Sequence, residues 1–343
     1  SWGNAELKKA GFEVVHEPDL TGDALQSAIA RTHCEVLIVR GTEVKAPMLA
    51  NVPTLGLIVR AGAGFNTIDV AAASKVGILV ANCPGKNAVA VAELTFGLIL
   101  ALDRRIVENV LDLRGGKWNK KDFSQARGLK GRTLGIIGMG QIGQAVVQRA
   151  AAFEMPVVAW SRSLTDEMAT GLGVERMATP TDVSRKCDIL SIHLAAAGET
   201  KKLVNRSVLE GLRPGSYVIN TARADVIDYE ALAKLIPEKN LRVGLDVFAN
   251  EPPGGAGEFA DAIVKAGGIV YGTHHIGAST DQAQDAIATE TVRIVREYAA
   301  TGRAPNSLNL ETSSPASCQM IVRHYDKVGV LATVLDKLRH EHI

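Results

Sequence analysis

The chain has few cysteines and few aromatic residues, and it lacks both a long run of one charge sign and a long apolar run. Its four cysteines are scattered without a Cys-x-x-Cys pair, which argues against a zinc site or a disulfide framework and favours a reducing, cytoplasmic location. The 38 basic and 37 acidic residues leave a net charge of +1, so neither nucleic acid nor a membrane surface is expected as the main partner. No apolar run approaches the roughly 20 residues of a membrane span and no signal peptide opens the chain, so we expect a soluble protein that binds a small molecule and no metal.

What the chain does have is length and an alternating pattern. Its 343 residues, 46% of them hydrophobic, are enough for two hydrophobic cores. Strand-like apolar runs alternate with helical stretches, which predicts α/β domains with parallel sheets. The expected strands cover residues 13–16, 36–39, 54–59 and 78–81 in the first part of the chain, and 133–137, 155–160, 189–193, 216–220, 243–247 and 269–272 in the second. Between the two parts, residues 88–113 read as one long helix whose apolar content predicts burial between layers or against a partner subunit.

A glycine-rich turn follows the first strand of the second part and has the spacing Gly-x-Gly-x-x-Gly. The first glycine permits a tight turn, the second lets backbone approach a pyrophosphate, and the third lets the next helix pack on the strand. The N–H groups at the start of that helix can bind phosphates. Since a helix and a second strand complete a β-α-β unit, we favour a dinucleotide site over an ordinary turn. The predicted cofactor residues here are Gly138, Gly140, Gln141, Ile142 and Gly143.

Chemically capable side chains follow three successive strands of the second part. Open parallel sheets bind ligands beyond the carboxyl ends of their strands, so these positions are the expected place for chemistry. They hold a cation, acids and imidazoles: Arg223 follows the first of these strands, Asp246 and Glu251 follow the second, and His274 and His275 follow the third. Taken alone, Arg223, Glu251 and His275 could each be structural, as a surface ion-pair partner, an exposed loop acid and a turn histidine.

At these residues the chain resembles the D-2-hydroxyacid dehydrogenase family, and the D-3-phosphoglycerate dehydrogenases within it are most similar. The resemblance covers nearly the whole chain and implies that Arg223 holds the carboxylate and carbonyl of the substrate. It implies that Glu251 holds the imidazole of His275, which exchanges the hydroxyl proton while hydride passes between substrate and nicotinamide. His274 stands where the family usually has proline. Because the three residues occur in the family's order, a structural role for all of them is not favoured.

A second glycine loop, in the first part of the chain, resembles the substrate loop of the family. The resemblance implies that Ala63 and Gly64 bind the substrate carboxylate through backbone N–H groups, with an ordinary turn as the alternative. Arg40 and Arg60, at the ends of strand-like runs, match arginines that phosphoglycerate dehydrogenases place near their substrate. This favours 3-phosphoglycerate. A glyoxylate or hydroxypyruvate reductase is the alternative, because arginine is common at strand ends and because sites for unphosphorylated acids also tolerate positive charge.

The ribose end of the predicted cofactor site departs from the common pattern. An acid usually ends the second strand, about 20 residues past the glycines, but Ser161 and Arg162 stand here. Without a carboxylate to repel a 2′-phosphate the sequence accepts NADP, whereas the resemblance favours NAD, and both stay open. The resemblance also assigns Thr221, Asp246 and Gly277 to the cofactor site, with a strand-end cap as the alternative for Asp246.

The end of the chain, residues 317–343, reads as a strand followed by a helix. It looks like the first half of an ACT regulatory module, which implies L-serine as an effector. Further strands, needed to bury the sheet face of such a module, are absent from this sequence. A linker rich in serine, asparagine and proline over residues 303–317 supports a boundary.

Together these observations predict an α/β enzyme with two domains and a partial ACT-like segment. We expect a smaller, flavodoxin-like substrate domain from residues 1–85 and 279–305, and a Rossmann NAD(P)-binding domain from residues 86–278. The resemblance implies an oxidoreductase of serine biosynthesis that converts 3-phosphoglycerate to 3-phosphohydroxypyruvate with NAD or NADP, assembled as a homodimer or homotetramer. A non-catalytic dinucleotide sensor, like the transcriptional corepressors of the family, is the alternative from another class, and the presence of all three catalytic residues speaks against it.

Overall fold

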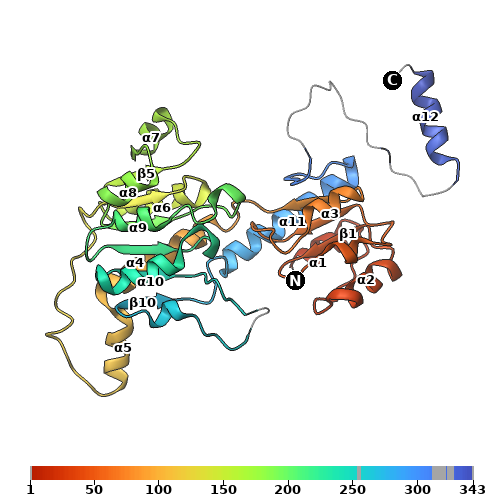
Figure 1. Ribbon diagram of the computed structural model, residues 1–343. Coiled ribbons are helices and arrows are strands. Elements are labelled where there is room, and N and C mark those ends of the chain that lie inside the picture. Colours follow the sequence, from red (N-terminus) through yellow and green to blue (C-terminus); the bar gives the residue numbers. More distant parts are fainter. Residues whose placement is uncertain (1, 253–255, 311–321, 323–327, 342–343) are drawn as a thin grey trace. The chain divides into compact units, whose positions relative to one another are not determined.

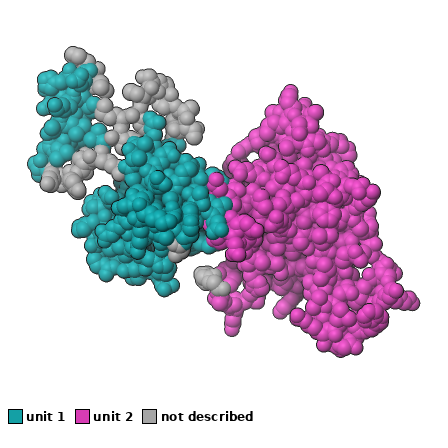
Figure 2. Space-filling view, turned by 180° about the vertical axis from the view of Figure 1, so that it is seen from behind, with its two compact units in different colours: residues 1–84, 285–343 teal, residues 85–284 magenta. Residues whose placement is uncertain are grey.

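The computed structural model describes residues 2–252, 256–310, 322 and 328–341. The chain divides into two compact units (Figures 1 and 2). Unit 1 comprises residues 1–84 and 285–343, and unit 2 comprises residues 85–284.

Unit 2 is built on a seven-stranded sheet in which every neighbouring pair of strands is parallel. The strands are β4 (Leu134–Ile137), β5 (Val157–Trp160), β6 (Glu175–Arg176), β7 (Ile189–Ile192), β8 (Tyr217–Asn220), β9 (Arg242–Leu245) and β10 (Ile269–Gly272). Their order is β10-β9-β8-β7-β4-β5-β6, so the direction of winding reverses between β4 and β7. In open α/β sheets such a reversal leaves a crevice at the carboxyl ends of the strands, and ligands bind there. The Rossmann-like fold and the parallel sheet predicted from the sequence are confirmed. The two-residue edge strand β6 was not predicted.

Helices cover both faces of this sheet and enclose one hydrophobic core on each side. α4 (Ala88–Arg104) and α6 (Gln141–Ala152) pack on one face, where Ile99, Leu102 and Val146 are fully buried. α8 (Pro180–Lys186), α9 (Arg206–Glu210) and α10 (Tyr229–Glu238) pack on the other face with residues such as Leu209 and Leu232. The central strands are buried on both faces, which explains their uninterrupted apolar sequences.

The predicted long helix over residues 88–113 is wrong, because the structure has two helices there. α4 ends at Arg104, and α5 (Ile106–Arg114) begins after Arg105, whose φ of 50° is left-handed. The guanidinium of Arg105 lies 4.7 Å from the ring centroid of Phe123. α4 is apolar and largely buried, as predicted, whereas none of the nine residues of α5 is buried.

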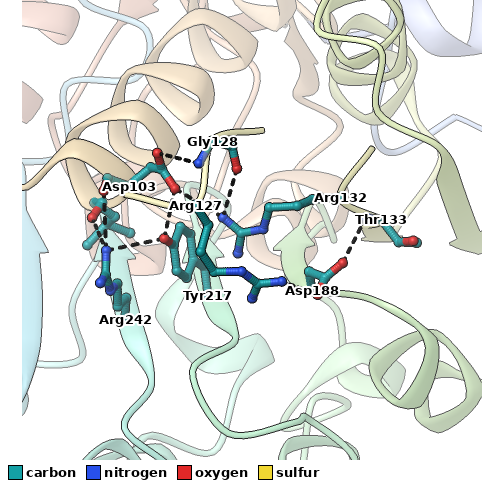
Figure 3. A network of polar contacts seen from close by, with 9 residues as sticks. Asp103, Arg127, Gly128, Arg132, Thr133, Asp188, Tyr217 and Arg242 are labelled. Atoms are coloured by element: carbon teal, nitrogen blue, oxygen red, sulfur yellow. Dashed lines mark hydrogen bonds and ion pairs between the residues drawn. The ribbon is translucent and has the colours of Figure 1, made fainter. Parts of the chain in front are cut away.

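A buried polar network ties together the amino ends of three strands of unit 2 (Figure 3). Asp103, near the end of α4, accepts hydrogen bonds from Arg132 Nη1 at 3.2 Å and from the Tyr217 hydroxyl at 3.1 Å. The Arg132 guanidinium lies 4.2 Å from the centroid of the Tyr217 ring, and Arg242 donates to the Leu102 carbonyl at 2.7 Å. These contacts fix the sheet at its amino edge, opposite to the carboxyl ends of the strands.

Unit 1 contains a smaller parallel sheet of three strands in chain order. These are β1 (Val36–Val39), β2 (Leu57–Arg60) and β3 (Leu79–Asn82). One face packs on α2 (Gly22–Arg31), the 3-10 helix η1 (Ala46–Leu49) and α3 (Val70–Lys75), and the other on α1 (Trp2–Lys9) and α11 (Asp281–Thr301). The strand predicted over residues 13–16 is wrong, because this stretch joins neither sheet of the described chain. Phe12 and Val14 are half-buried against the core instead.

The predicted ACT-like segment over residues 317–343 is described at residues 322 and 328–341. Its predicted strand lies outside the described residues apart from Val322, while its helix is present as α12 (Val330–His340), which buries no residue. Among the helices of the described chain, none combines the length and apolar character needed to cross a membrane.

Candidate active site

The three glycines of the turn between β4 and α6 differ in their surroundings: two are packed against backbone, and one borders open space. Gly138 has a left-handed φ of 103°, and a Cβ there would overlap the backbone carbonyl of His193. A Cβ on Gly143 would overlap the carbonyl of Gly138. By contrast, a Cβ on Gly140 would meet no atom of the described residues within 4 Å, so packing does not require glycine there. The missing side chain leaves room above the start of α6.

That open space lies at a helix start suited to an anion. Gly140 is the N-cap of α6 and has no side chain to bond the first N–H groups, among them those of Gln141 and Ile142. Such groups, together with the helix dipole, bind phosphate. The turn therefore fits the pyrophosphate of a dinucleotide. The Gln141 side chain itself lies over Gly85, where a Cβ would overlap its amide.

Arg223 lies on the loop that follows β8, and hydrogen bonds with Asn220 hold the backbone of this loop. Asn220 donates from Nδ2 to the Arg223 carbonyl at 2.9 Å and accepts the Ala222 N–H at 3.0 Å. Burial lowers the pKa of Arg223, and the nearby charges of Glu251 and Asp246 raise it. The guanidinium thus lies within the electrostatic reach of both acids. Thr221, also in this loop, is buried and shares a 3.0 Å hydrogen bond with Thr95 of α4.

Glu251 and His275 form a hydrogen-bonded pair. The distance from His275 Nδ1 to Glu251 Oε2 is 2.8 Å, and Glu251 Oε1 accepts the Phe248 N–H at 2.8 Å. Burial acts to raise the pKa of Glu251, but the bonds from His275 and Phe248 and the charges of His275 and Arg223 outweigh it, and the pKa is lowered. An ionised carboxylate only accepts, so Nδ1 carries the proton in this pair and Nε2 is the nitrogen left to exchange a proton with a ligand.

Asp246, at the end of β9, fastens the loop that carries His275. Its Oδ1 accepts the Thr273 hydroxyl at 2.6 Å and the Ile276 N–H at 2.8 Å, and its Oδ2 accepts the Gly277 N–H at 2.8 Å. The carboxylate is 1% exposed. His275 between these anchors has a left-handed φ of 53°, a conformation that needs such support in a residue other than glycine.

His193, which directly follows β7 at the winding reversal, is buried, and burial favours its neutral form. Its Nε2 shares a 2.8 Å hydrogen bond with the Ser191 hydroxyl, and burial lowers the pKa of His193 to about 3. Its Nδ1 has no hydrogen-bond partner in the described part of the chain.

Ser161 and Arg162 follow β5, at the place where a ribose-binding acid is usual. Arg162 Nη1 lies 2.6 Å from Oε1 of Glu199, a residue of the 3-10 helix η2 (Gly198–Thr200). Sequence reasoning missed Glu199, since 37 positions separate it from Arg162.

In unit 1 the predicted substrate residues gather at the carboxyl edge of the small sheet. Arg40 directly follows β1 and is exposed, and Arg60 ends β2, with its guanidinium lying against Gly62. Asn82, at the end of β3, donates to the Ala63 carbonyl at 2.6 Å. Because the C=O and N–H of a trans peptide point in opposite directions, the Gly64 N–H faces away from Asn82. Sequence reasoning gave Asn82 no role in orienting this loop.

Metal ligands do not cluster in this chain as far as it is described. No group of three or more histidine, cysteine, aspartate or glutamate side chains there is placed to hold a metal ion.

The chain matches known proteins over most of its length. A family model described as "D-isomer specific 2-hydroxyacid dehydrogenase, NAD binding domain" matches residues 96–277. A hydroxypyruvate reductase of Thermotoga maritima is 38% identical over 288 residues, which are 83% of this chain and 90% of that protein. A D-3-phosphoglycerate dehydrogenase of Methanocaldococcus jannaschii is 35% identical over 278 residues, 80% of this chain.

Structural similarity extends to a solved NAD⁺-bound 3-phosphoglycerate dehydrogenase of Entamoeba histolytica. The TM-score is 0.74 at 26% identity, with 90% of this chain and 93% of that chain covered. The match to the Methanocaldococcus dehydrogenase covers 52% of that protein, so the chain spans about half of its length.

Proposed function

The chain belongs to the D-isomer specific 2-hydroxyacid dehydrogenase family, and on this basis we propose that it interconverts a D-2-hydroxyacid and the matching 2-keto acid with a nicotinamide dinucleotide. The observation that carries the proposal is the Glu251–His275 pair, held at the same sheet edge as the open glycine turn. We further propose that unit 2 is the dinucleotide domain and that unit 1 is the substrate domain, of the flavodoxin-like type.

In the proposed reaction His275 is the acid and base. The nicotinamide ring, when bound, supplies the acceptor or donor of hydride. During oxidation His275 Nε2 takes the hydroxyl proton as the carbon–hydrogen bond breaks and its electron pair leaves with the hydride. Glu251 stabilises the imidazolium that results, and Arg223 binds the carboxylate and the developing carbonyl with its planar fork. In reduction the same proton returns to the substrate oxygen.

For the substrate we propose 3-phosphoglycerate, oxidised to 3-phosphohydroxypyruvate in serine biosynthesis. Arg40 and Arg60 support a phosphate at the carboxyl edge of the small sheet, and the Gly64 N–H supports an anion at the glycine loop. The relatives named D-3-phosphoglycerate dehydrogenase also support 3-phosphoglycerate as the substrate. The Thermotoga relative at 38% identity favours hydroxypyruvate or glyoxylate reduction as the second candidate.

Substitution of Arg60 separates the two candidates. For a phosphorylated substrate, Arg60→Ala is expected to raise KM for 3-phosphoglycerate by about 10- to 100-fold, because one charge-assisted contact to phosphate is lost. KM for hydroxypyruvate would change much less. Equal effects on both substrates would contradict the phosphate assignment and favour the reductase.

For assembly we propose a homodimer or homotetramer in which α5 is covered by a second copy. α5 exposes Ile106, Val107, Val110, Leu111 and Leu113, and apolar side chains exposed together on one helix favour a protein–protein contact. A cytoplasmic location agrees with Cys34, Cys83 and Cys187, which are all free thiols. For the ACT-like segment we propose L-serine as the effector.

A further inference from the structure

The ion pair between Arg162 and Glu199 lies across the predicted dinucleotide crevice. Arg162 belongs to the loop after β5, and Glu199 belongs to η2 in the connection after β7. β5 and β7 are the two neighbours of β4 in the sheet. A contact between their loops therefore spans the carboxyl end of β4, where the glycine turn begins.

The backbone on both sides of this pair is fixed. The Thr200 hydroxyl donates to the Ala195 carbonyl at 2.6 Å and accepts the Ala197 N–H at 2.9 Å, which holds the short helix that carries Glu199. On the other side, the Leu164 N–H donates to the Ser161 carbonyl at 3.2 Å and closes the turn around Arg162. The two side chains themselves are 58% and 80% exposed for Glu199 and Arg162, so a ligand can reach both.

The acids that follow Arg162 in sequence are engaged elsewhere. Asp166 pairs with Arg176 at 3.3 Å, and Glu167 lies in the first turn of the next helix, where hydrogen bonds from its own N–H and from Thr165 lower its pKa. The carboxylate beside Arg162 thus comes from another strand's loop rather than from the end of β5.

Building on the proposed dehydrogenase function, we propose that Glu199 sets the choice between NAD and NADP by competing with a 2′-phosphate for Arg162. The ribose 2′ position of a dinucleotide lies at the end of the second strand of such a fold, which is β5 here. NAD can bind while the ion pair stays intact. To bind, the 2′-phosphate of NADP must replace Glu199 as the partner of Arg162. The phosphate then lies near the negative carboxylate of Glu199, which weakens its binding. The chain therefore prefers NAD, although the usual acid is missing, and keeps a latent capacity for NADP.

The size of this effect follows from solvent-exposed electrostatics. Like charges a few ångströms apart at an exposed site change binding by about 5- to 20-fold at low salt. The effect falls as ionic strength rises, because screening weakens interactions between exposed charges.

The test is binding of two adenosine fragments to the full chain by calorimetry. Glu199→Gln is expected to bind adenosine 2′,5′-bisphosphate about 10-fold more tightly than the unaltered chain, and 5′-AMP within about twofold. Adding Arg162→Gln should abolish the gain. Glu210→Gln is the matched control, since Glu210 also pairs with an exposed arginine, Arg206 at 2.7 Å, but on α9. That variant should leave both fragments unchanged.

The outcomes distinguish this inference from the function on which it rests. If Glu199→Gln leaves the bisphosphate affinity unchanged, or tightens both fragments equally, Glu199 does not discriminate between the cofactors. If NAD and NADP both fail to bind the unaltered chain, the dehydrogenase proposal fails, and the inference fails with it.

Discussion

Replacing Gly140 by alanine tests whether the open space at the start of α6 is a ligand site. Gly140 has a φ of −71°, which any residue can adopt, and a Cβ there meets none of the described atoms within 4 Å. Alanine is a poorer N-cap than glycine but restricts the unfolded chain, so the free energy of unfolding should change by less than about 1 kcal/mol. The fold should therefore tolerate the substitution.

Dinucleotide binding should respond differently to Gly140→Ala. The added methyl group occupies the space through which a phosphate approaches the first N–H groups of α6. Losing one charge-assisted hydrogen bond costs about 1.5–3 kcal/mol, which corresponds to an increase of about 10- to 100-fold in Kd.

Gly143→Ala is the matched comparison on the same turn. Its Cβ would overlap the Gly138 carbonyl, so the strand and the helix must move apart. We expect the free energy of unfolding to fall by about 1–3 kcal/mol, as for other overpacked core positions. Gly138→Ala should be at least as harmful, because it adds the strain of a left-handed φ to an overlap with the His193 carbonyl.

Two measurements separate the variants. Urea unfolding followed by tryptophan fluorescence, without cofactor, gives the free energy of unfolding, and titration with NADH gives Kd. If Gly140→Ala bound NADH as tightly as the unaltered chain, the phosphate would not lie at this turn. If it lost as much stability as Gly143→Ala, the space above Gly140 would not be open.

Three further predictions concern single side chains. His275→Ala should lower turnover by about 10²- to 10⁴-fold, measured by nicotinamide absorbance, while Kd for NADH stays the same; full activity would reassign the base. Because His193 has a pKa of about 3 when folded and about 6.5 when unfolded, the unfolded chain binds more protons between these values and stability falls as pH drops. At pH 5.5 the contribution of His193 to this loss of stability is about 1 kcal/mol, and urea titrations should show that His193→Gln lacks this contribution. Asn82→Ala should raise KM for the keto acid and leave Kd for NADH unchanged, because it frees the Ala63 carbonyl of the substrate loop; an unchanged KM would remove Asn82 from the site.

Strands could be predicted from the sequence better than breaks in helices could. β1 and β10 have the predicted bounds, because short apolar runs between turn residues leave little choice. The break at Arg105 was not predicted, since no glycine or proline marks it and its left-handed φ is accompanied by a stacking contact with Phe123, which is distant in sequence. The stretch at residues 13–16 has strand-like residues, but no strand of the described sheets pairs with it.

The rule that ligands bind beyond strand ends pointed to the loops that carry Arg223, Glu251 and His275, and the family resemblance selected these residues within them, whereas their hydrogen-bond partners needed coordinates. The rule names the edge of the sheet and not the hydrogen bonds. Asn220 ends β8 and Asp246 directly follows β9, but nothing in the local sequence shows that Asn220 holds the Arg223 loop and Asp246 the His275 loop. The role of Glu199 could not be predicted from the sequence, because its partner Arg162 lies on the loop after β5, on the other side of β4 from β7.

Two buried aspartates show how the same sheet separates stability from chemistry. Asp103 and Asp246 are 2% and 1% exposed, and each accepts at least three hydrogen bonds. At the amino edge, Asp103 accepts hydrogen bonds from the side chains of Arg132 and Tyr217 and from the Gly128 N–H, which joins the end of α4 to the amino ends of β4 and β8. At the carboxyl edge, Asp246 bonds the backbone on both sides of His275, so its carboxylate determines where the imidazole lies. In this sheet the buried acid at the amino ends of the strands, Asp103, stabilises the fold. The buried acid at their carboxyl ends, Asp246, also positions His275 on the loop that follows β10.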